Sequence, residues 1–283
     1  MNNVKILADS TCDLSEELIK AHDISIIPLM ITLGNDTLKD GIEINPDAIY
    51  EWSDRTGQTP KTAAPAIGDA VDFMMPYVNQ EMDIIFFGIS EAMSATCQVL
   101  RLAAGQLEYP KLYVVDSKNL STGIGLQVLR AAELAAKGYG AEEILEDNRN
   151  INNKVRASFV VDTLTFLHRG GRCSGVAALL ANTLKLKPEI TVKDGKMEVE
   201  KKYRGNSKAV LMKYCREKES LLKDADPARI FITHSGCPRD VVEEVRDYLI
   251  GLDIFGEVLE TRAGSVISSH CGPNTLGILF ISR

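Results

Sequence analysis

The stretch that decides the fold runs Asp83-Ile84-Ile85-Phe86-Phe87-Gly88-Ile89-Ser90-Glu91-Ala92-Met93-Ser94-Ala95-Thr96-Cys97-Gln98. Its first half is an unbroken apolar run, which is typical of a strand buried on both faces of a parallel sheet. Its second half changes to small and hydroxyl residues, and a helical pattern follows from Val99. A strand that turns into a helix offers free backbone N–H groups to an anion. The stretch therefore predicts an anion site at a strand end.

Outward from this stretch, strands alternate with helices. Strands are predicted at residues 4–8, 24–32 and 112–115, and the intervening segments are long enough for helices. This alternation indicates an α/β unit with a mainly parallel sheet. Parallel sheets bind ligands at the carboxyl ends of their strands. Asp9, Gly88 and Asp116 each end a predicted strand, so we expect them to share one edge of the sheet.

The pattern changes after Asn153. Asp194-Gly195 joins predicted strands at 187–192 and 197–204, which is a strong hairpin signal. Residues 35–40, 56–65 and 264–274 are predicted to be irregular, the second because it holds two prolines close together. We therefore expect an α/β protein of two domains. Residues 1–153 form an N-terminal α/β/α unit with a mainly parallel sheet, and residues 154–283 form a C-terminal α/β unit with a mixed sheet.

Length, composition and charge narrow the class of protein. With 283 residues and 45% hydrophobic content, the chain is long enough to bury a large core. A formal net charge of −7 argues against binding to nucleic acid or to a membrane surface. The chain shows no signal peptide and no apolar run of membrane-spanning length. Its six cysteines contain no C-x-x-C pair, which favours reduced thiols. These features predict a cytoplasmic protein without stable membrane insertion.

One enzymatic alternative is a serine hydrolase. Gly88-Ile89-Ser90-Glu91-Ala92 nearly matches the G-x-S-x-G nucleophile elbow, and His270 follows late in the chain as that fold requires. The hydroxyl residues that follow, Ser94 and Thr96, indicate a longer polar turn than an elbow has. A capping role for Ser90 is therefore favoured, and the hydrolase with Ser90 and His270 stays as the alternative.

Two cofactor sites are also weakly indicated. Gly123-Ile124-Gly125 opens a helix after a strand, but Val128 replaces the third glycine of a dinucleotide fingerprint, so close helix packing is favoured. His270-Cys271 and the pair His234 with Cys237 offer metal ligands without a compact motif. We expect neither a metal nor a cofactor.

Arginines beside glycines give a stronger signal. Arg169-Gly170-Gly171-Arg172 combines unusual backbone freedom with fixed cations that suit a carboxylate or phosphate. The alternative is a solvated turn between helices. Arg204 is similar, either an exposed edge charge or an anion contact. His270 lies between glycine- and proline-containing segments, where a histidine is free to donate a hydrogen bond or to exchange a proton.

Taken together, these segments resemble the DegV family of bacterial fatty-acid-binding proteins. The resemblance covers essentially the whole chain, and its pieces occur in the following order: Asp9-Ser10-Thr11-Cys12-Asp13-Leu14, Thr62-Ala63-Ala64-Pro65, Ile89-Ser90 through Ser94-Ala95-Thr96, Val115-Asp116-Ser117, Leu167-His168-Arg169-Gly170-Gly171-Arg172, Lys187-Pro188 with Gly195 and Arg204, and His270-Cys271-Gly272-Pro273.

The resemblance implies that the chain binds a single long-chain fatty acid and is not itself an enzyme. The carboxylate would lie at the domain junction, held by Thr62 and Ser94 with His270 close by, and the acyl chain would be buried. The resemblance also implies a partner, a separate fatty acid kinase that converts the bound lipid to an acyl phosphate for phospholipid synthesis. Arg204 is implicated with that kinase, and Arg172, Gly170 and Gly171 are expected near the head group or the kinase.

The chain departs from the family pattern at three positions. It has Ala63 where a serine is usual, Ala95 where a glycine is usual, and Cys97 where an aromatic residue is usual. Ala95 is expected to narrow the carboxylate site and Cys97 to free volume for the acyl chain. A binder of another anionic lipid or of a phosphorylated small molecule is the remaining alternative.

Overall fold

The opening stretch forms β6 (Asp83–Gly88), an inner strand of a four-stranded sheet in the computed structural model. The structure describes residues 3–173, 175–180 and 186–283. The strand order is β2 (Ser25–Ile27), β1 (Val4–Asp9), β6 and β7 (Leu112–Asp116), and all neighbours are parallel. Asp9, Gly88 and Asp116 end three adjacent strands, so the prediction that they share one edge is confirmed.

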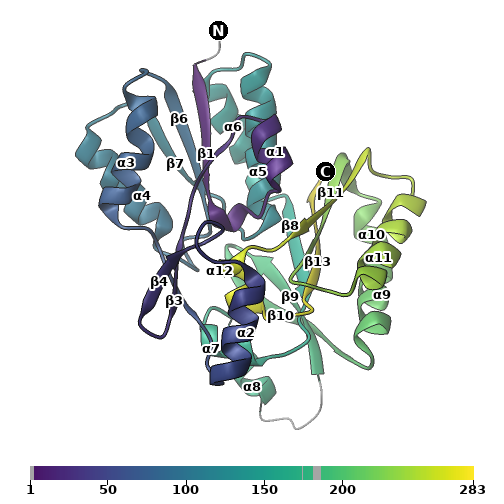
Figure 1. Cartoon of the computed structure of the whole chain (residues 1–283). Helices are drawn as coiled ribbons and strands as arrows, with labels where there is room; N and C mark the ends of the chain where they lie inside the picture. The colour runs from purple at the N-terminus through teal and green to yellow at the C-terminus, as the bar shows by residue number, and fades with distance from the viewer. Residues whose placement is uncertain (1–2, 174, 181–185) are drawn as a thin grey trace.

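Helices cover both faces of this first sheet, as Figure 1 shows. Ile84 and Phe86 pack against α3 (Ile67–Val78) and α4 (Thr96–Leu107), whereas Ile85 and Phe87 face α5 (Thr122–Ala136). All four side chains are fully buried. Alternate residues of a strand point to opposite faces, so an unbroken apolar run is what a doubly covered strand requires. Two further helices, α1 (Glu16–Ala21) and α6 (Ala141–Asn152), lie on the α5 side.

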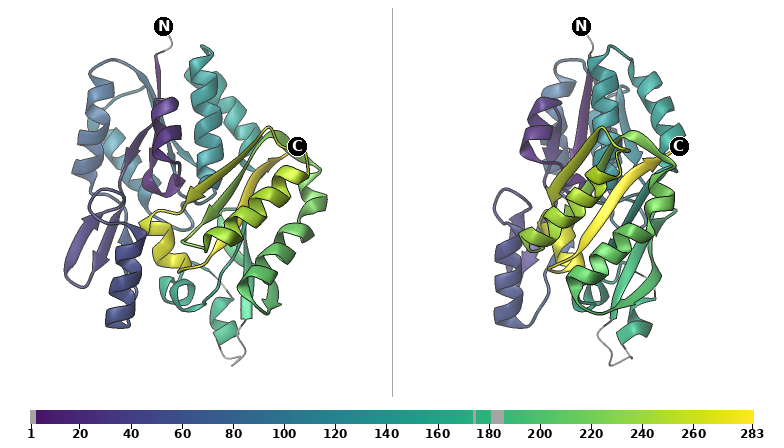
Figure 2. Two further views of the ribbon diagram at one scale, coloured as in Figure 1. Left: turned by 45° about the vertical axis from the view of Figure 1, so that its right-hand side comes forward. Right: turned by 90° about the vertical axis from the view of Figure 1, so that its right-hand side faces the viewer.

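The second sheet is mixed, as predicted. Its strand order is β10 (Lys196–Arg204), β9 (Leu186–Lys193), β8 (Val155–Val160), β13 (Leu276–Ser282), β11 (Ala225–His234) and β12 (Glu257–Arg262). Only β11 and β12 pair in parallel; the other neighbours are antiparallel. Its outer face carries α9 (Ser207–Glu217), α10 (Glu219–Leu222) and α11 (Arg239–Gly251), seen in front of the strands in Figure 2.

The helix α5 lies between the two sheets. Its residues Ile124 and Val128 join one apolar cluster with Ile6 of β1 and with Phe159 and Leu279 of the second sheet. A helix covered on two sides must be apolar around most of its circumference, and most of α5 is buried. The expected division at residues 153 and 154 falls in the turn between α6 and β8, and the assignment of two domains stays a prediction.

Three segments that were predicted to be irregular contain regular structure. Residues 36–39 and 61–63 form β4 (Asp36–Lys39) and β5 (Lys61–Ala63), which pair with β3 (Met30–Leu33) in a small antiparallel sheet. Residues 265–271 form α12 (Ser265–Cys271). In Figure 1, α12 lies between α2 (Pro46–Thr56) and the second sheet. A C-terminal helix thereby contacts the N-terminal half of the chain.

Short elements complete the structure. A 3-10 turn, η1 (Ser10–Cys12), follows β1, and α7 (Thr165–Gly170) and α8 (Val176–Leu180) follow β8. Within the described ranges, every helix is too short or too polar to cross a lipid bilayer.

Candidate ligand-binding cavity

A cavity of about 280 Å³ lies where the small sheet, the first sheet, α12 and the second sheet meet. Most of its lining is apolar, from Leu29, Ala63, Ala64, Ile89, Met93, Ala95, Leu120, Met197, Val266, Ile267 and Cys271. The polar lining consists of Thr62, Ser94, Arg172 and His270. These residues come from segments far apart in the chain, so the cavity exists only in the folded protein.

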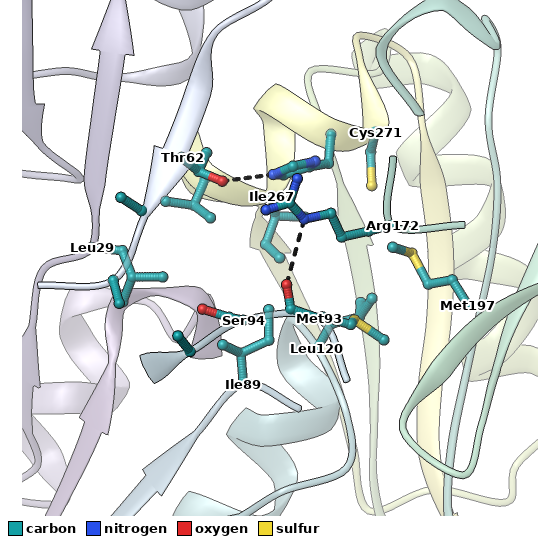
Figure 3. Close-up of a pocket in the computed structure, with 15 residues that line it drawn as sticks. Leu29, Thr62, Ile89, Met93, Ser94, Leu120, Arg172, Met197, Ile267 and Cys271 are labelled. Atoms are coloured by element: carbon teal, nitrogen blue, oxygen red, sulfur yellow. Dashed lines mark hydrogen bonds between the residues drawn. The ribbon is translucent and has the colours of Figure 1, made fainter. Parts of the chain in front are cut away.

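The cavity is polar toward solvent and apolar inside. Thr62 and Ser94 are half-buried, and Ala63, Ala95 and Arg172 beside them are exposed. The apolar residues Leu29, Leu120 and Met197 are instead 2–4% exposed. In Figure 3, Thr62 and Ser94 lie on the same side as Leu29, while Met197 and Cys271 lie on the opposite side. An amphipathic ligand would therefore keep its polar end near the surface and its apolar end inside.

Thr62 and His270 are joined by a hydrogen bond across the junction. The distance from Thr62 Oγ1 to His270 Nε2 is 2.8 Å, and the bond links β5 to the end of α12 (Figure 3). Burial, with the positive charge of Arg172 nearby, lowers the pKa of His270 from 6.5 to about 4. The imidazole is therefore neutral at pH 7, and it serves the site as a hydrogen-bonding group without a charge.

Gly170 lies directly against the His270 ring. A Cβ atom on Gly170 would come within 2.3 Å of His270 Nδ1, which no real contact allows. This Nδ1 atom is buried and has no hydrogen-bond partner among the described residues. If the proton of the neutral ring is on Nε2, the ring donates to Thr62 and leaves the hydroxyl proton of Thr62 available to a ligand. Gly170 thus makes room for the ring that orients Thr62.

Ser94 lies in the turn between β6 and α4. Its Oγ is 2.8 Å from Oγ1 of Thr96 and accepts a hydrogen bond from the Thr96 backbone N–H at 3.3 Å. The N-cap residue of α4, Ala95, has no capping side chain and lines the cavity. The start of this helix therefore combines a hydroxyl with the positive end of the helix dipole, an arrangement that favours an anion.

Arg172 supplies a positive charge to the cavity. Its Nη1 donates to the carbonyl of Gly170 at 2.7 Å, and its Nε donates to the carbonyl of Met93 at 3.5 Å. Carbonyl partners leave the guanidinium charge unneutralised by these contacts. Since Arg172 is exposed, water screens part of this charge.

Three predicted residues lie outside the cavity lining: Gly170, which packs against the His270 ring, Gly171 and Arg204. Gly171 adopts φ +66° and ends α7, and its N–H donates to the carbonyl of His168. Arg204 is the exposed last residue of β10 and lines a separate groove of about 610 Å³. This groove is rich in basic residues, and its lining is Leu186, Lys201, Lys202, Tyr203, Arg204, Ala209, Val210 and Lys213.

The geometry of a serine hydrolase is not formed. Ser90 is 1% exposed, and its hydroxyl donates to the carbonyl of Gly195 at the tip of the β9–β10 hairpin, at 2.7 Å. Ser90 is not in the cavity lining, and His270 bonds to Thr62 instead. The preferred interpretation of Ser90 as a structural residue fits this position.

The structure also places the glycines and the possible metal ligands of the two cofactor alternatives. A Cβ on Gly123 would meet Asn119 at 2.1 Å and one on Gly125 would meet Leu14 at 2.8 Å, so these glycines serve close helix packing as predicted. Among the residues that the structure describes, no group of three or more His, Cys, Asp or Glu side chains could hold a metal ion.

The three departures from the family pattern have different surroundings. Ala63 and Ala95 both line the cavity at its exposed side. Cys97 does not line it: its sulfur lies under the end of β6, 3.8 Å from the carbonyl of Ile89, and a Cβ on Gly88 would meet it at 2.5 Å. Volume freed at Cys97 therefore belongs to the contact between α4 and β6, which corrects the expectation that it enlarges the acyl site.

The apolar lining was not predicted from the sequence. Leu29, Met197 and Ile267 are ordinary core residues by pattern, and only the folded arrangement of α12, the small sheet and the β9–β10 hairpin brings them to one cavity. The chain carries one signal for part of this wall, the pairing of Val266 with His270 at a helical spacing of four residues. That spacing can be recognised only once residues 265–271 are known to be helical.

The fold and the cavity define a class: an α/β protein with two sheets and a cavity that is polar near the surface and apolar inside. The family model described as "Uncharacterised protein, DegV family" matches residues 3–283. A DegV domain-containing protein of Clostridium perfringens is 31% identical over the full length of both chains. The chain belongs to the DegV family.

Solved structures of the same family are closely similar. A DegV family protein from Thermus thermophilus, described by its fatty acid binding, superposes with a TM-score of 0.91 at 30% identity and covers 99% of this chain and 100% of its own. DegV from Bacillus subtilis, described as a fatty acid binding protein, has a TM-score of 0.85 at 26% identity over both full lengths. A stearic-acid-binding protein from Eubacterium ventriosum has a TM-score of 0.86 at 25% identity, with 99% and 98% coverage.

Proposed function

We propose that this protein binds one long-chain fatty acid, with the carboxylate at Thr62, Ser94 and His270 and the acyl chain in the apolar part of the cavity. The observation that carries the proposal is the polarity of the cavity. Two hydroxyls and a guanidinium lie toward solvent beside the buried, neutral imidazole of His270, and buried aliphatic and thioether side chains line the interior. This distribution matches a ligand with one anionic end and a long hydrocarbon tail.

The physical chemistry of each end supports the proposal. Each methylene group removed from water contributes about 0.8 kcal/mol, so the tail supplies most of the affinity. The hydroxyls and the start of α4 provide directed hydrogen bonds, without which a buried carboxylate is costly. Arg172 adds a cation at the polar end, so the head group does not rely on neutral donors alone.

The size of the cavity fits a flexible ligand with some adjustment. Its volume of about 280 Å³ lies near the lower limit of roughly 300 Å³ for ligand pockets. Met93 and Met197 line its interior, and unbranched thioether side chains change shape at little cost. Rotation of these methionines would lengthen the space available to the tail. The fatty acid binding described for the Thermus, Bacillus and Eubacterium relatives supports the same ligand class.

The proposal extends to a partner protein in the cytoplasm. A carboxylate held near the surface is accessible to a second protein, and the Ser90 hydroxyl bonds to the carbonyl of Gly195 and not to a base. We infer that the chain presents its lipid to a separate fatty acid kinase, which forms an acyl phosphate for phospholipid synthesis. The basic groove around Arg204 is the docking surface we assign to that kinase, because it is exposed and carries four cationic residues on an otherwise acidic chain.

The lipid itself provides the first test. Organic extraction of the purified protein, followed by mass spectrometry, should yield close to one fatty acid per chain. Replacing both hydroxyls in the Thr62→Ala, Ser94→Ala variant should remove most of the lipid while the circular dichroism spectrum stays unchanged, because the carboxylate loses its donors. Thr37→Ala is the matched control: Thr37 is an exposed hydroxyl residue of the same small sheet and lies outside the cavity.

Three outcomes would contradict the proposal. Unchanged lipid content in the double variant would refute the head-group assignment. An empty wild-type protein that hydrolyses an activated ester, and loses this activity in Ser90→Ala, would favour the hydrolase. Extraction of a phospholipid or another anionic lipid in place of a fatty acid would change the ligand class.

The docking surface has its own test. Arg204→Ala should lower the rate of acyl phosphate formation by the cognate kinase about tenfold, which corresponds to ~1.4 kcal/mol. The lipid content should stay unchanged, because Arg204 does not line the cavity. Arg216→Ala, which removes an exposed arginine from outside the groove, should leave the rate unchanged. Equal rates for Arg204→Ala and the wild type would rule out this surface.

A further inference from the structure

The motif Asp9-Ser10-Thr11-Cys12-Asp13 lies outside the cavity lining, yet the polar side chains of Asp9, Thr11 and Asp13 are buried. Asp9 and Asp13 are 0% and 5% exposed, and the neighbouring Asp40 is 3% exposed. Buried carboxylates are costly unless each oxygen accepts hydrogen bonds. The hydrogen-bond partners of these oxygens therefore indicate the structural role of the motif.

Two of the carboxylates hold the start of α12. Asp13 Oδ1 accepts a hydrogen bond from the backbone N–H of Gly264 at 2.8 Å, and Asp40 Oδ1 accepts one from the N–H of Ser265 at 2.9 Å. Their other oxygens accept from the hydroxyls of Ser121 and Ser10, at 2.5 and 2.8 Å. The N-cap residue Gly264 has no side chain with which to cap the helix itself.

The start of α12 is thus capped by the opposite half of the chain. A short helix leaves its first N–H groups without partners, and a carboxylate is the strongest available acceptor for them. The same helix contributes Val266, Ile267, His270 and Cys271 to the cavity. Because the helix has only seven residues, a shift or rotation at its start displaces the His270 ring at its end.

The rest of the motif holds two other walls of the cavity. Asp9 Oδ2 accepts a hydrogen bond from the backbone N–H of Ile89 at 2.8 Å, and Ser10 Oγ accepts one from the N–H of Leu29 at 3.1 Å. Both Ile89 and Leu29 line the cavity. The motif therefore bonds to three walls without touching the space between them.

We propose that Asp13 and Asp40 are positioning residues for the fatty-acid site, which fix α12 and thereby set His270 against Thr62. The predicted effect on fatty-acid binding rests on the proposed function. The role of Asp13 and Asp40 in fixing α12 does not depend on it.

The electrostatics of the cluster show that the arrangement is costly. Burial raises the pKa of Asp9 from 3.8 to about 6 and raises the pKa of Asp13 and Asp40 above the usual value, and repulsion from Asp40 adds to the shift at Asp9 and Asp13. The hydrogen bonds that the three carboxyl groups accept from the cavity walls offset this cost. These contacts also order the cavity walls.

The test compares an acceptor deletion with its conservative replacement. Asp13→Ala removes the acceptor for Gly264, whereas Asp13→Asn can still accept from Gly264 through its carbonyl and donate to Ser121 through its amide. Tyr214→Phe is the matched control, because it likewise removes a buried hydrogen-bonding group, a hydroxyl that bonds to Ser158 and Ile278 in the other core cluster. Asp40→Ala, which releases Ser10 and the start of α12 at Ser265, replaces Asp13→Ala if that variant does not fold.

Two measurements follow on each purified, delipidated variant. The first is the affinity for palmitic acid, by displacement of a fluorescent fatty acid; the second is hydrogen exchange of residues 264–271. Asp13→Ala should weaken palmitic acid binding about tenfold and raise the exchange rate by a similar factor, as the loss of one buried hydrogen-bond acceptor implies. Asp13→Asn should stay within about threefold of the wild type in both, and Tyr214→Phe should affect neither selectively.

The results separate the two proposals. If Asp13→Ala weakens binding no more than Tyr214→Phe does, or if Asp13→Asn is as defective as Asp13→Ala, the positioning role is wrong. If the wild type binds no palmitic acid, the proposed ligand is wrong. The hydrogen-exchange rate of residues 264–271 then still decides whether Asp13 fixes α12. An exchange rate in Asp13→Ala equal to that of the wild type would overturn the structural part of the proposal.

Discussion

At the scale of single residues, the site depends on a histidine that is neutral because it is buried. His270 bonds to Thr62, packs against Gly170 and lies near the positive charge of Arg172. Burial and the positive charge of Arg172 both disfavour the protonated ring. A neutral imidazole can receive or pass on a hydrogen bond without attracting a second anion into the cavity.

This lowered pKa predicts a pH-dependent loss of stability. In the unfolded chain His270 takes up a proton near pH 6.5, but in the folded protein it does so only near pH 4. The stability that the neutral His270 ring contributes is therefore fully present above pH 6.5 and falls as the pH drops toward 4. Between pH 7.5 and 4.5 the contribution of His270 should decrease by roughly 2–3 kcal/mol. Urea unfolding of the wild type and His270→Gln at both pH values measures this as a change in their difference.

The comparison with His270→Gln is needed because Asp9 acts in the opposite direction. Its pKa is raised to about 6, so folding takes up a proton and gains stability as the pH falls from 6 toward 4. The wild-type curve alone mixes the two effects. A difference between wild type and His270→Gln that is the same at both pH values would refute the neutral, buried state of His270.

At the scale of elements, the long strands and helices were predictable from local pattern, and β5 and α12 were not. The apolar run at 83–88 and the Asp194-Gly195 turn encode their structures within a few residues. In contrast, β5 has three residues and forms because it pairs with β3. The start of α12 is capped by Asp13 and Asp40, more than 200 positions earlier in the chain. No local pattern carries such partners.

The same distinction applies to the cavity. Its polar residues belong to short motifs that were visible in the sequence, and Thr62, Ser94, Arg172 and His270 all line the cavity. Arg204 and Gly171 belong to equally visible motifs but lie elsewhere. The sequence motifs therefore located polar turns, and the fold determined which of those turns meet.

At the scale of the whole molecule, the two sheets are joined through α5. This helix packs on β1 of the first sheet and on β8 and β13 of the second, and all belong to one apolar cluster. Separating the halves would expose one side of α5 together with the facing strands. Apolar exposure on this scale costs far more than the marginal stability of a domain.

We therefore expect the protein to unfold in a single transition. Calorimetry should give one peak whose calorimetric and van't Hoff enthalpies agree, and residues 1–153 produced alone should not give a cooperative transition. Two separate peaks, or a stable folded fragment 1–153, would instead support two independent domains.

The position of α5 has a consequence for making hybrids within the family. A chimera that joins residues 1–153 of this chain to the C-terminal half of a relative about 30% identical would set α5 against a foreign sheet. A chimera divided between residues 153 and 154 would therefore pack poorly around α5, although the division cuts neither sheet. Hybrids that also transfer the inward-facing residues of α5 should recover, which makes this helix the part of the chain that specifies which second half it accepts.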